Sequence, residues 1–314
     1  MRPRLILAAA LAAIVLGGVM LVPAAYARFK GDPPAVLGLT GSTASPSPSR
    51  TLGPPPSPPP PTLKARSVTV RVNGFLSWAL LDRKTGKIAG SSNIRATNST
   101  ESMIKVWLAS DYLRRTAAAG RQPTATRLTQ ASRAIRLSDD NAAESLFNAG
   151  GRSPVIDRLI KICRLTDTSK VVPAGDDTVW WSYTRMSPRD AVRMGQCVAD
   201  GRAAGPRWTR WILAEMTKVW GTTAAKDQHA TWGGGHWGIV DGLPANLKAG
   251  LSIKNGWTLI NADGLWHLDC LAVHKDWVLS VMTRYPGRYG LAYGANVCKS
   301  VAHQLVYQPP AGQG

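Results

Sequence analysis

The sequence is poor in cysteine, in acidic residues and in metal-binding patterns. Its four cysteines are too few for a disulfide-rich miniprotein, and the absence of a C-x-x-C pair argues against a zinc ribbon. Its five histidines form neither H-x-x-x-H nor H-E-x-x-H, so we expect no metal site. No repeat with a period of about 20–50 residues is present, which argues against a solenoid.

Basic residues outnumber acidic residues by 38 to 19, which gives a net charge of +19. This balance excludes an acidic disordered chain, and the 44% of hydrophobic residues is enough for a sizeable core. No recognition helix or base-stacking motif accompanies the charge, so we expect no nucleic-acid partner. Attraction to an anionic cell-wall polymer or a membrane surface accounts for the charge, and so does a simply solvated basic surface.

The N-terminal segment is typical of export. Arg2 and Arg4 precede the 18-residue apolar run Leu5–Val22, and Ala25-Tyr26-Ala27 has the form of a signal-peptidase site. The run is also just long enough to span a bilayer. Residues 1–27 are therefore either a cleaved signal peptide or a retained transmembrane anchor. Both alternatives predict an extracytoplasmic protein that is secreted or anchored to the cell membrane.

Proline and serine dominate the next segment, residues 28–66, which includes the run Pro54–Pro61 interrupted only by Ser57. Such a composition cannot bury a core and favours an extended spacer. We therefore expect one folded domain over residues 67–308, followed by a short tail at 309–314.

The folded part alternates between strand-like and helical patterns. We expect a hairpin first, with a strand over 68–82, a turn at 83–87 and a return strand from Ile88. Helical spacing then predicts helices at 102–119, 124–136, 141–148, 155–163, 188–199 and 208–219. After a glycine loop at 233–235 come β-like segments at 249–257, 266–273 and 277–283, and then a helix at 291–305. This order favours an α+β fold, with an antiparallel sheet built from both chain ends and an inserted all-α subdomain.

Ser102-Met103-Ile104-Lys105 forms an S-x-x-K motif at a predicted helix start. Residues three apart lie on one face of a helix, so the Ser102 hydroxyl and the Lys105 amine are neighbours. The free N–H groups of a helix N-terminus favour a serine that must carry an oxyanion-forming acyl group. A lysine kept neutral by a nearby cation can act as the base for that serine.

Two further polar triplets follow in order, Ser138-Asp139-Asp140 and Lys254-Asn255-Gly256. The first precedes a predicted helix, and the second lies on the first β-like segment after the helical block. Together with S-x-x-K they form three sides of one predicted pocket. In this order and context the sequence resembles the serine β-lactamase and penicillin-binding protein superfamily, whose motifs are S-x-x-K, S-D-N and K-T-G. The resemblance covers most of residues 67–308 and is greatest to secreted class A β-lactamase-like serine hydrolases.

The resemblance implies four catalytic residues. Ser102 would be the nucleophile, and Lys105 the base that takes its proton. Ser138 would pass a proton to the leaving nitrogen. Lys254 would attract a substrate carboxylate and help to keep Lys105 neutral.

The resemblance also implies four substrate-binding residues. Asp140 stands at the family's Asn position, which binds the substrate amide, and Asn255 replaces the Thr that donates to the carboxylate. Gly256 would let the strand backbone approach the substrate. The N–H groups of Ser102 and Trp257 would form the oxyanion hole.

One departure from the family limits the expected activity. Class A β-lactamases carry a glutamate on a loop after S-D-N, which activates the deacylating water, but residues 166–195 contain no glutamate. The carboxylates in that stretch are Asp167, Asp176, Asp177 and Asp190. We therefore expect weak or no β-lactamase turnover, and a peptidase, an esterase-like hydrolase or a slow acyl-trap is favoured.

A literal K-T-G is also present at Lys84-Thr85-Gly86. It precedes the S-x-x-K motif and lies in a predicted hairpin turn, so its order and its place are both wrong for a catalytic motif. We interpret it as a turn.

The remaining cysteines and tryptophans leave alternatives open. In an exported chain two disulfides are allowed, and we favour Cys163–Cys197 and Cys270–Cys298 because each pair lies in one region, although free thiols are an alternative. Tryptophans near the expected cleft suit either glycan binding or packing of its wall, and packing is the favoured interpretation. These are Trp180, Trp181, Trp232 and Trp237, whereas Trp257 is placed at the site by its motif.

These observations predict an exported serine hydrolase that acylates Ser102 with an amide or ester. The expected substrate is a peptidoglycan-like peptide or a β-lactam, and neither a metal nor an organic cofactor is implied. The first alternative is a non-catalytic protein of the same fold that binds cell-wall peptide or an anionic envelope polymer. The second is a basic adhesion or scaffold domain on a proline-rich stalk.

Overall fold

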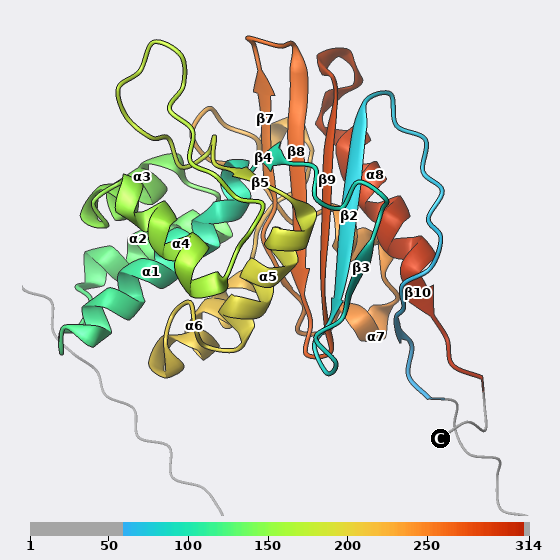
Figure 1. Ribbon diagram of the computed structural model, residues 1–314, viewed down its shortest axis with the longest axis horizontal. Helices are drawn as coiled ribbons and strands as arrows, with labels where there is room; N and C mark the ends of the chain where they lie inside the picture. The colour runs from blue at the N-terminus through green and yellow to red at the C-terminus, as the bar shows by residue number, and fades with distance from the viewer. Residues whose placement is uncertain (1–58, 311–314) are drawn as a thin grey trace, which may run out of the picture. The chain divides into compact units, whose positions relative to one another are not determined.

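The computed structural model describes residues 59–310, and the predicted signal or anchor segment lies outside them. The body is built on a six-stranded sheet in the order β3-β2-β9-β8-β6, with β7 also paired to β8 (Figure 1). All of these pairings are antiparallel. The strands are β2 (Phe75–Asp82), β3 (Ile88–Gly90), β6 (Ser252–Ile253), β7 (Gly256–Ile260), β8 (Leu265–Val273) and β9 (Trp277–Pro286). The sheet therefore joins strands from both chain ends, as the sequence predicts.

A helical block lies between the two groups of strands in sequence and beside the sheet in space (Figure 1). A 3-10 helix, η1 (Glu101–Ile104), leads directly into the first α-helix. The helices are α1 (Lys105–Ala118), α2 (Ala125–Arg136), α3 (Asp140–Ala149), α4 (Ser153–Cys163), α5 (Pro188–Ala199) and α6 (Pro206–Met216). Two further helices follow, α7 (Ala245–Lys248) and α8 (Gly290–Leu305). The expected fold class and the inserted helical block are confirmed.

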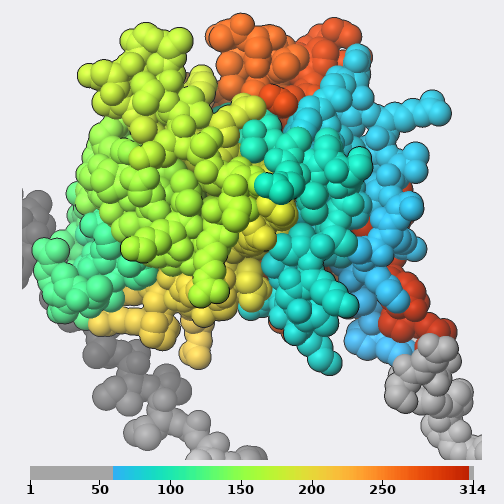
Figure 2. Space-filling model, viewed as in Figure 1, coloured from blue at the N-terminus to red at the C-terminus, as the bar shows by residue number. Residues whose placement is uncertain are grey.

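Alternating side chains place a hydrophobic core on each face of the sheet. In β2, Ala79 and Leu81 face the core shared with the helical block, whereas Trp78 and Leu80 face the core shared with α8. This is the period of two that a buried strand imposes. The sheet is thus covered on both faces. On the face shown in Figure 2, the hairpin and the loop after it pack directly against the green-to-yellow helices.

The first strand is shorter than the sequence pattern predicts. Residues 68–72 form no strand, and β2 begins only at Phe75. The reason is Gly74, whose φ of +146° breaks the extended run, and a side chain there would meet the Arg284 carbonyl oxygen. Lys84-Thr85-Gly86 does lie in the hairpin turn, where Asp82 Oδ1 accepts hydrogen bonds from the N–H groups of Lys84 and Thr85.

The described ends of the chain lie side by side. Strand β1 (Thr62–Leu63) pairs with β10 (Val306–Tyr307), so two residues of the expected linker form part of the fold. A further two-stranded pair joins β4 (Asn98–Ser99) to β5 (Arg185–Met186) beside η1. Within residues 59–310 no helix is long and apolar enough to cross a membrane.

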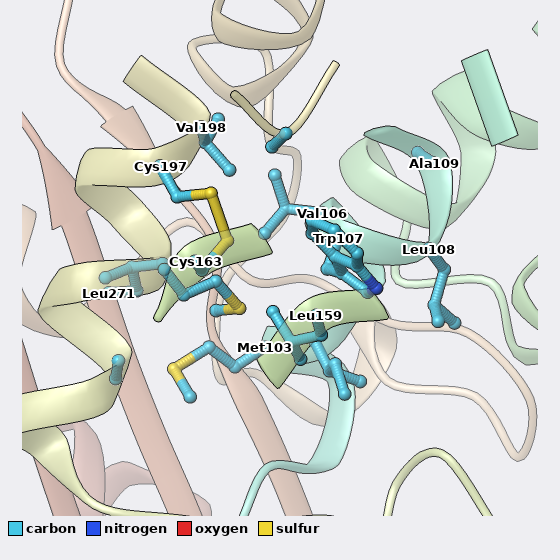
Figure 3. Packing of buried hydrophobic residues seen from close by; sticks show 14 of the residues in the cluster. Met103, Val106, Trp107, Leu108, Ala109, Leu159, Cys163, Cys197, Val198 and Leu271 are labelled. Carbon is cyan, nitrogen blue, oxygen red and sulfur yellow. A yellow bond between two sulfur atoms is a disulfide. The ribbon is translucent and has the colours of Figure 1, made fainter. Parts of the chain in front are cut away.

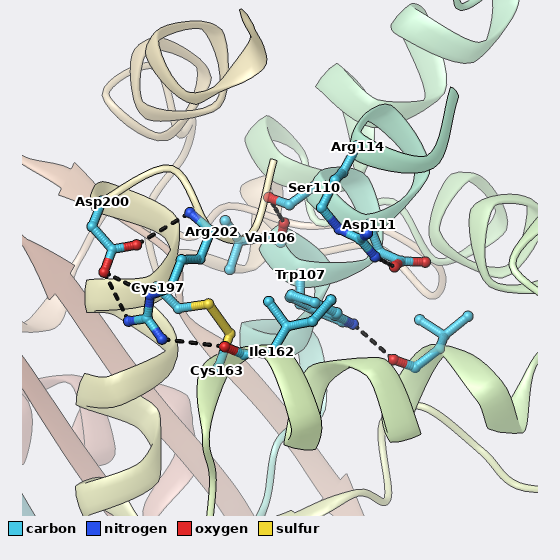
Figure 4. The surroundings of a disulfide bond; sticks show 11 residues. Val106, Trp107, Ser110, Asp111, Arg114, Ile162, Cys163, Cys197, Asp200 and Arg202 are labelled. Atoms are coloured by element: carbon cyan, nitrogen blue, oxygen red, sulfur yellow. Dashed lines mark hydrogen bonds and ion pairs between the residues drawn. A yellow bond between two sulfur atoms is a disulfide. The ribbon is translucent and has the colours of Figure 1, made fainter. Parts of the chain in front are cut away.

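Both expected disulfides are confirmed, and each one reinforces a different core. Cys163–Cys197 joins α4 to α5 on the helical side, and Cys270–Cys298 joins β8 to α8 on the other side. Around the first, Arg202 donates to the Ile162 carbonyl and pairs with Asp200 (Figure 4). Closing loops of 34 and 28 residues restricts the unfolded chain.

Candidate active site

A cavity of about 820 Å³ lies between the helical block and β7. Four of the eight predicted site residues line it, namely Ser102, Ser138, Asp140 and Trp257. The other four, Lys105, Lys254, Asn255 and Gly256, are buried. The structure therefore brings the three sequence motifs together around one cavity, although they lie far apart in the chain.

Ser102 lies in η1, whose backbone is anchored by two buried apolar side chains. Met103 and Ile104 are fully buried, and Met103 packs among Leu159, Cys163 and Leu271 (Figure 3). The Ser102 side chain is half-buried and faces the cavity. Within residues 59–310 its hydroxyl makes no hydrogen bond, so the Ser102 hydroxyl and the Lys105 amine are not joined in this state of the molecule.

Lys105 is fully buried, and two acceptors hold its amine. Its Nζ lies 2.6 Å from the Ser138 carbonyl oxygen and 2.5 Å from Asp140 Oδ1. Burial lowers the pKa of Lys105, and the Asp140 carboxylate opposes that shift. A neutral amine would use its two hydrogens on these acceptors and keep its lone pair for a third group.

Lys254 is linked to the cavity wall through a hydrogen bond to Ser138. Its amine is fully buried, donates to Ser138 Oγ at 2.9 Å and to the Asn255 carbonyl at 2.9 Å, and does not line the cavity. Burial lowers the pKa of Lys254 well below its usual value, and repulsion from Lys105 adds to the shift. To contact a substrate carboxylate directly, the Lys254 amine would therefore have to break one of these two hydrogen bonds.

The amide of Asn255 points away from the cavity. Its Nδ2 donates to the carbonyl oxygens of Gly235 and Trp237, at 2.9 and 2.8 Å. Both of its donor hydrogens are therefore used to fix the glycine loop against β7. In this arrangement Asn255 supports the wall of the site and has no hydrogen free for a substrate.

In the Ser138-Asp139-Asp140 triplet, the middle residue caps a helix and the other two line the cavity. Asp139 is the N-cap of α3, where its side chain accepts from Ala142 N and pairs with Arg133. Ser138 adopts a left-handed backbone with φ 54°, and so its hydroxyl reaches Lys254. Asp140 begins α3, and its carboxylate is 46% exposed toward the cavity while it pairs with Lys105.

Gly256 allows β7 to lie directly against η1. A Cβ at this position would lie 2.6 Å from Met103 N, 2.7 Å from Thr100 O and 2.8 Å from Ser102 N. No other residue type fits between these backbones. The next residue, Trp257, faces the cavity, and its indole N–H donates to Gln228.

Aromatic side chains make up much of the cavity wall. Trp180, Trp181 and Trp232 line it, whereas Trp237 is buried against Trp257. Trp181 donates to Glu144 at 2.9 Å, and its ring lies 4.9 Å from the Lys105 amine. The tryptophans therefore include both cleft wall and core, and Trp180 is 42% exposed.

The carboxylates of residues 166–195 make their contacts away from the cavity. Asp190 lies in the first turn of α5, where it accepts from the N–H groups of Thr166 and Asp167. Asp167 pairs with Arg95 and Arg189. None of the carboxylates in this stretch lines the cavity. The carboxylates that do are Glu101, Asp140 and Glu144.

Glu101 is the cavity residue that sequence reasoning missed. It directly precedes the nucleophile position, is 2% exposed, and has a left-handed backbone with φ 43°. The signal in the sequence is an acid immediately before S-x-x-K in a chain with three glutamates. A single acidic residue carries no pattern, so its burial could not be predicted.

The fold is shared with solved structures of serine β-lactamases and of PBP-A. A β-lactamase from Xanthomonas campestris pv. campestris superimposes with a TM-score of 0.54 at 17% identity, over 74% of this chain and 91% of that chain. A structure described as PBP-A gives 0.55 at 14% identity, over 75% and 90%. The chain thus has the fold of the serine β-lactamase and penicillin-binding protein superfamily.

In sequence the chain is similar to a mycobacterial protein. It is 28% identical over 196 residues to the "Putative lipoprotein LppW" of Mycobacterium tuberculosis, which is 62% of this chain. The match spans 57%, less than two thirds, of the length of that relative. No family model matches the sequence.

Proposed function

We propose that the protein is an exported serine hydrolase that acylates Ser102 with an amide or ester of cell-wall peptide or β-lactam type. The observation that supports this most is the convergence of Ser102, the buried Lys105 and the Lys254–Ser138 pair around one cavity. Three motifs separated by long stretches of chain meet there. The fold supports the same chemistry, since its solved neighbours include a β-lactamase and PBP-A.

The residues suggest a complete acylation step. Ser102 Oγ forms a bond to the substrate carbonyl carbon while its proton passes to the neutral Lys105 amine. The oxygen that becomes negative would lie between the N–H groups of Ser102 and Trp257. The C–N bond then breaks, the proton returns to the leaving nitrogen through the Ser138 hydroxyl, and an acyl ester remains on Ser102.

Hydrolysis of that ester is expected to be slow. Of the three cavity carboxylates, Asp140 and Glu144 are engaged with Lys105 and Arg152, respectively, and Glu101 is 2% exposed and held against Thr258. None of them stands free to activate a water molecule. We therefore propose a long-lived acyl-enzyme rather than a fast β-lactamase.

Export and an extracytoplasmic location remain part of the proposal. Two disulfides suit an oxidising compartment, and the similar mycobacterial protein is named a lipoprotein. All four cysteines of this sequence are paired. A lipid-modified cysteine is thus not available among these residues, and residues 1–27 would serve as signal or anchor.

A second candidate is a non-catalytic protein of the same fold that binds cell-wall peptide. It is favoured by the resting arrangement, in which Asp140 holds the Lys105 amine and the Ser102 hydroxyl has no partner among the described residues. The same chain could then bind an anionic envelope polymer through its +19 charge. Acylation separates this candidate from the hydrolase.

The deciding experiment is intact-mass spectrometry of the purified chain after incubation with a penicillin, beside Ser102→Ala. We expect an adduct on the wild type alone, persisting over hours. Rapid loss of the adduct would reveal an unforeseen water-activating group. The absence of any adduct on the wild type, with salt-sensitive binding to an anionic polymer, would favour the non-catalytic candidate.

Replacing Asp140 by asparagine should accelerate acylation by roughly tenfold, the effect of about 1.4 kcal/mol in the barrier. The carboxylate raises the pKa of Lys105, so its removal lowers that pKa and increases the fraction of neutral amine. The acidic limb of the rate profile should therefore move to lower pH. The rate of adduct formation across pH measures both effects.

A matched control is Asp157→Asn, which breaks the exposed Asp157–Lys170 pair outside the cavity lining. It should leave the rate unchanged, because exposed pairs contribute little. Slower acylation in Asp140→Asn alone would instead mean that the carboxylate takes part in the reaction.

A further inference from the structure

The carboxyl group of Glu101 lies between the two segments that would supply the oxyanion hole. Glu101 directly precedes Ser102, one proposed donor. Its Oε2 lies 2.6 Å from the hydroxyl oxygen of Thr258, the residue that follows Trp257, the other proposed donor. The Glu101 side chain therefore links η1 to β7 next to the two residues whose N–H groups are the proposed donors. The left-handed backbone of Glu101 is a strained conformation for a residue with a side chain.

The hydrogen bonds at this position are consistent with a neutral acid. Thr258 Oγ1 lies 2.6 Å from Glu101 Oε2 and 2.7 Å from the Trp257 carbonyl oxygen. A hydroxyl has one hydrogen, and a carbonyl can only accept. If the hydroxyl donates to Trp257, the short contact with Glu101 requires a proton on Oε2.

The second carboxyl oxygen gives the same indication. Glu101 Oε1 is buried and has no hydrogen-bond partner among the residues that the structure describes. Leaving an ionised oxygen unpaired in a desolvated place is costly, whereas a neutral acid tolerates it better.

We propose that Glu101 works as a neutral carboxylic acid that ties the Ser102 segment to β7, and that its ionisation opposes the oxyanion and so turns acylation off. This inference rests on the proposed acylation of Ser102. Glu101 is thus a positioning residue, since it acts through the Ser102 and Trp257 donors. An anion beside both donors would repel the negative charge that the reaction develops.

The groups around Glu101 bring the pKa of its carboxyl group close to neutral pH. Burial, the largest cause, raises the pKa of Glu101 to about 7, and Asp140 adds to the rise. The nearby Ser99 hydroxyl, the hydrogen bonding with Thr258 and the charge of Lys105 lower it. Other charged or titratable groups interact with Glu101 from the neighbouring elements, namely Arg185 on β5, Asp269 on β8 and Tyr183 in the loop before β5.

A polar chain connects this place to the surface. Ser99 Oγ lies 2.8 Å from His267 Nδ1, and His267 Nε2 lies 2.8 Å from Asp263 Oδ2. Ser99 and His267 are buried, whereas the Asp263 side chain is 42% exposed. Burial lowers the pKa of His267, which favours the neutral ring at this point of the chain.

Because the sequence contains three glutamates, NMR can follow Glu101 directly. In protein labelled with [5-¹³C]glutamate, Glu101→Gln removes one carboxyl signal and thereby assigns it. We expect that signal to titrate near pH 7. A midpoint near the ordinary value of about 4.3 would overturn the neutral acid, whether or not the protein acylates.

The catalytic consequence is measured with a fluorescent penicillin between about pH 5 and 9. Above pH 7, the ratio of the Glu101→Gln rate to the wild-type rate should rise about tenfold per pH unit, because the amide cannot ionise. Glu215→Gln, on α6, is the control and should keep the wild-type profile. A constant ratio overturns the proposal. Absence of acylation at every pH overturns the proposed function and with it the catalytic role, while the NMR midpoint still decides the protonation state.

Discussion

Replacing Lys105 by methionine should slow acylation of Ser102 by about three to four orders of magnitude, the contribution of a positioned general base. Methionine fills the buried volume but cannot take the serine proton. Burial lowers the pKa of Lys105, so the wild-type rate should rise as pH increases through that lowered value. The sign follows from the chemistry, since only the neutral amine has a lone pair. The variant should lose this pH dependence together with the rate.

Stability provides a test that separates catalysis from folding. The Lys105 amine is fully buried, so Lys105→Met replaces a desolvated polar group by an apolar one and leaves Asp140, which is 46% exposed, to be solvated. The melting temperature should therefore stay the same or rise. Lys161→Met, on the exposed side of α4, is the charge-matched control for the rate. Wild-type acylation by Lys105→Met would show that another group is the base.

The helical and strand patterns were sufficient to predict most of the fold, because these elements bury one regular face. Helix α5 begins and ends at the predicted residues, Pro188 and Ala199, where Ser187 caps a strongly amphipathic segment. The order of the elements also predicted a sheet that joins strands from both ends of the chain. The first strand was predicted too long, since the valines at 68–72 alternate like a strand but Gly74 ends the pairing.

The meeting of the three motifs around one cavity could be predicted, whereas the orientation of their side chains could not. Motif order predicts that Ser102, Ser138 and Lys254 lie close together. The spacing of the motifs does not predict that the Lys254 amine donates a hydrogen bond to Ser138 instead of facing the cavity. The amide of Asn255 turns toward the Gly235 and Trp237 carbonyls because the glycine loop packs there. Such choices depend on tertiary neighbours, which no local pattern encodes.

Replacing Gly256 by alanine should slow acylation by about two to three orders of magnitude, the effect of losing an oxyanion donor. The added Cβ would lie 2.6–2.8 Å from backbone atoms of Thr100, Ser102 and Met103, closer than such atoms approach. Either β7 or η1 must move, because backbone cannot rotate away as a side chain does. The Ser102 and Trp257 N–H groups would then separate. Overpacking of this kind also destabilises a protein by about 1–3 kcal/mol.

The rate of penicillin adduct formation and thermal melting measure the two effects together. Gly235→Ala is the matched control, because its nearest neighbours are side-chain atoms of Val219 and Trp257 at 3.3–3.5 Å, which can yield. It lies beside the same cavity wall and should lose far less activity. If Gly256→Ala acylates as fast as the wild type, the N–H group of Trp257 is not an oxyanion donor, and the close approach of β7 to η1 serves stability alone.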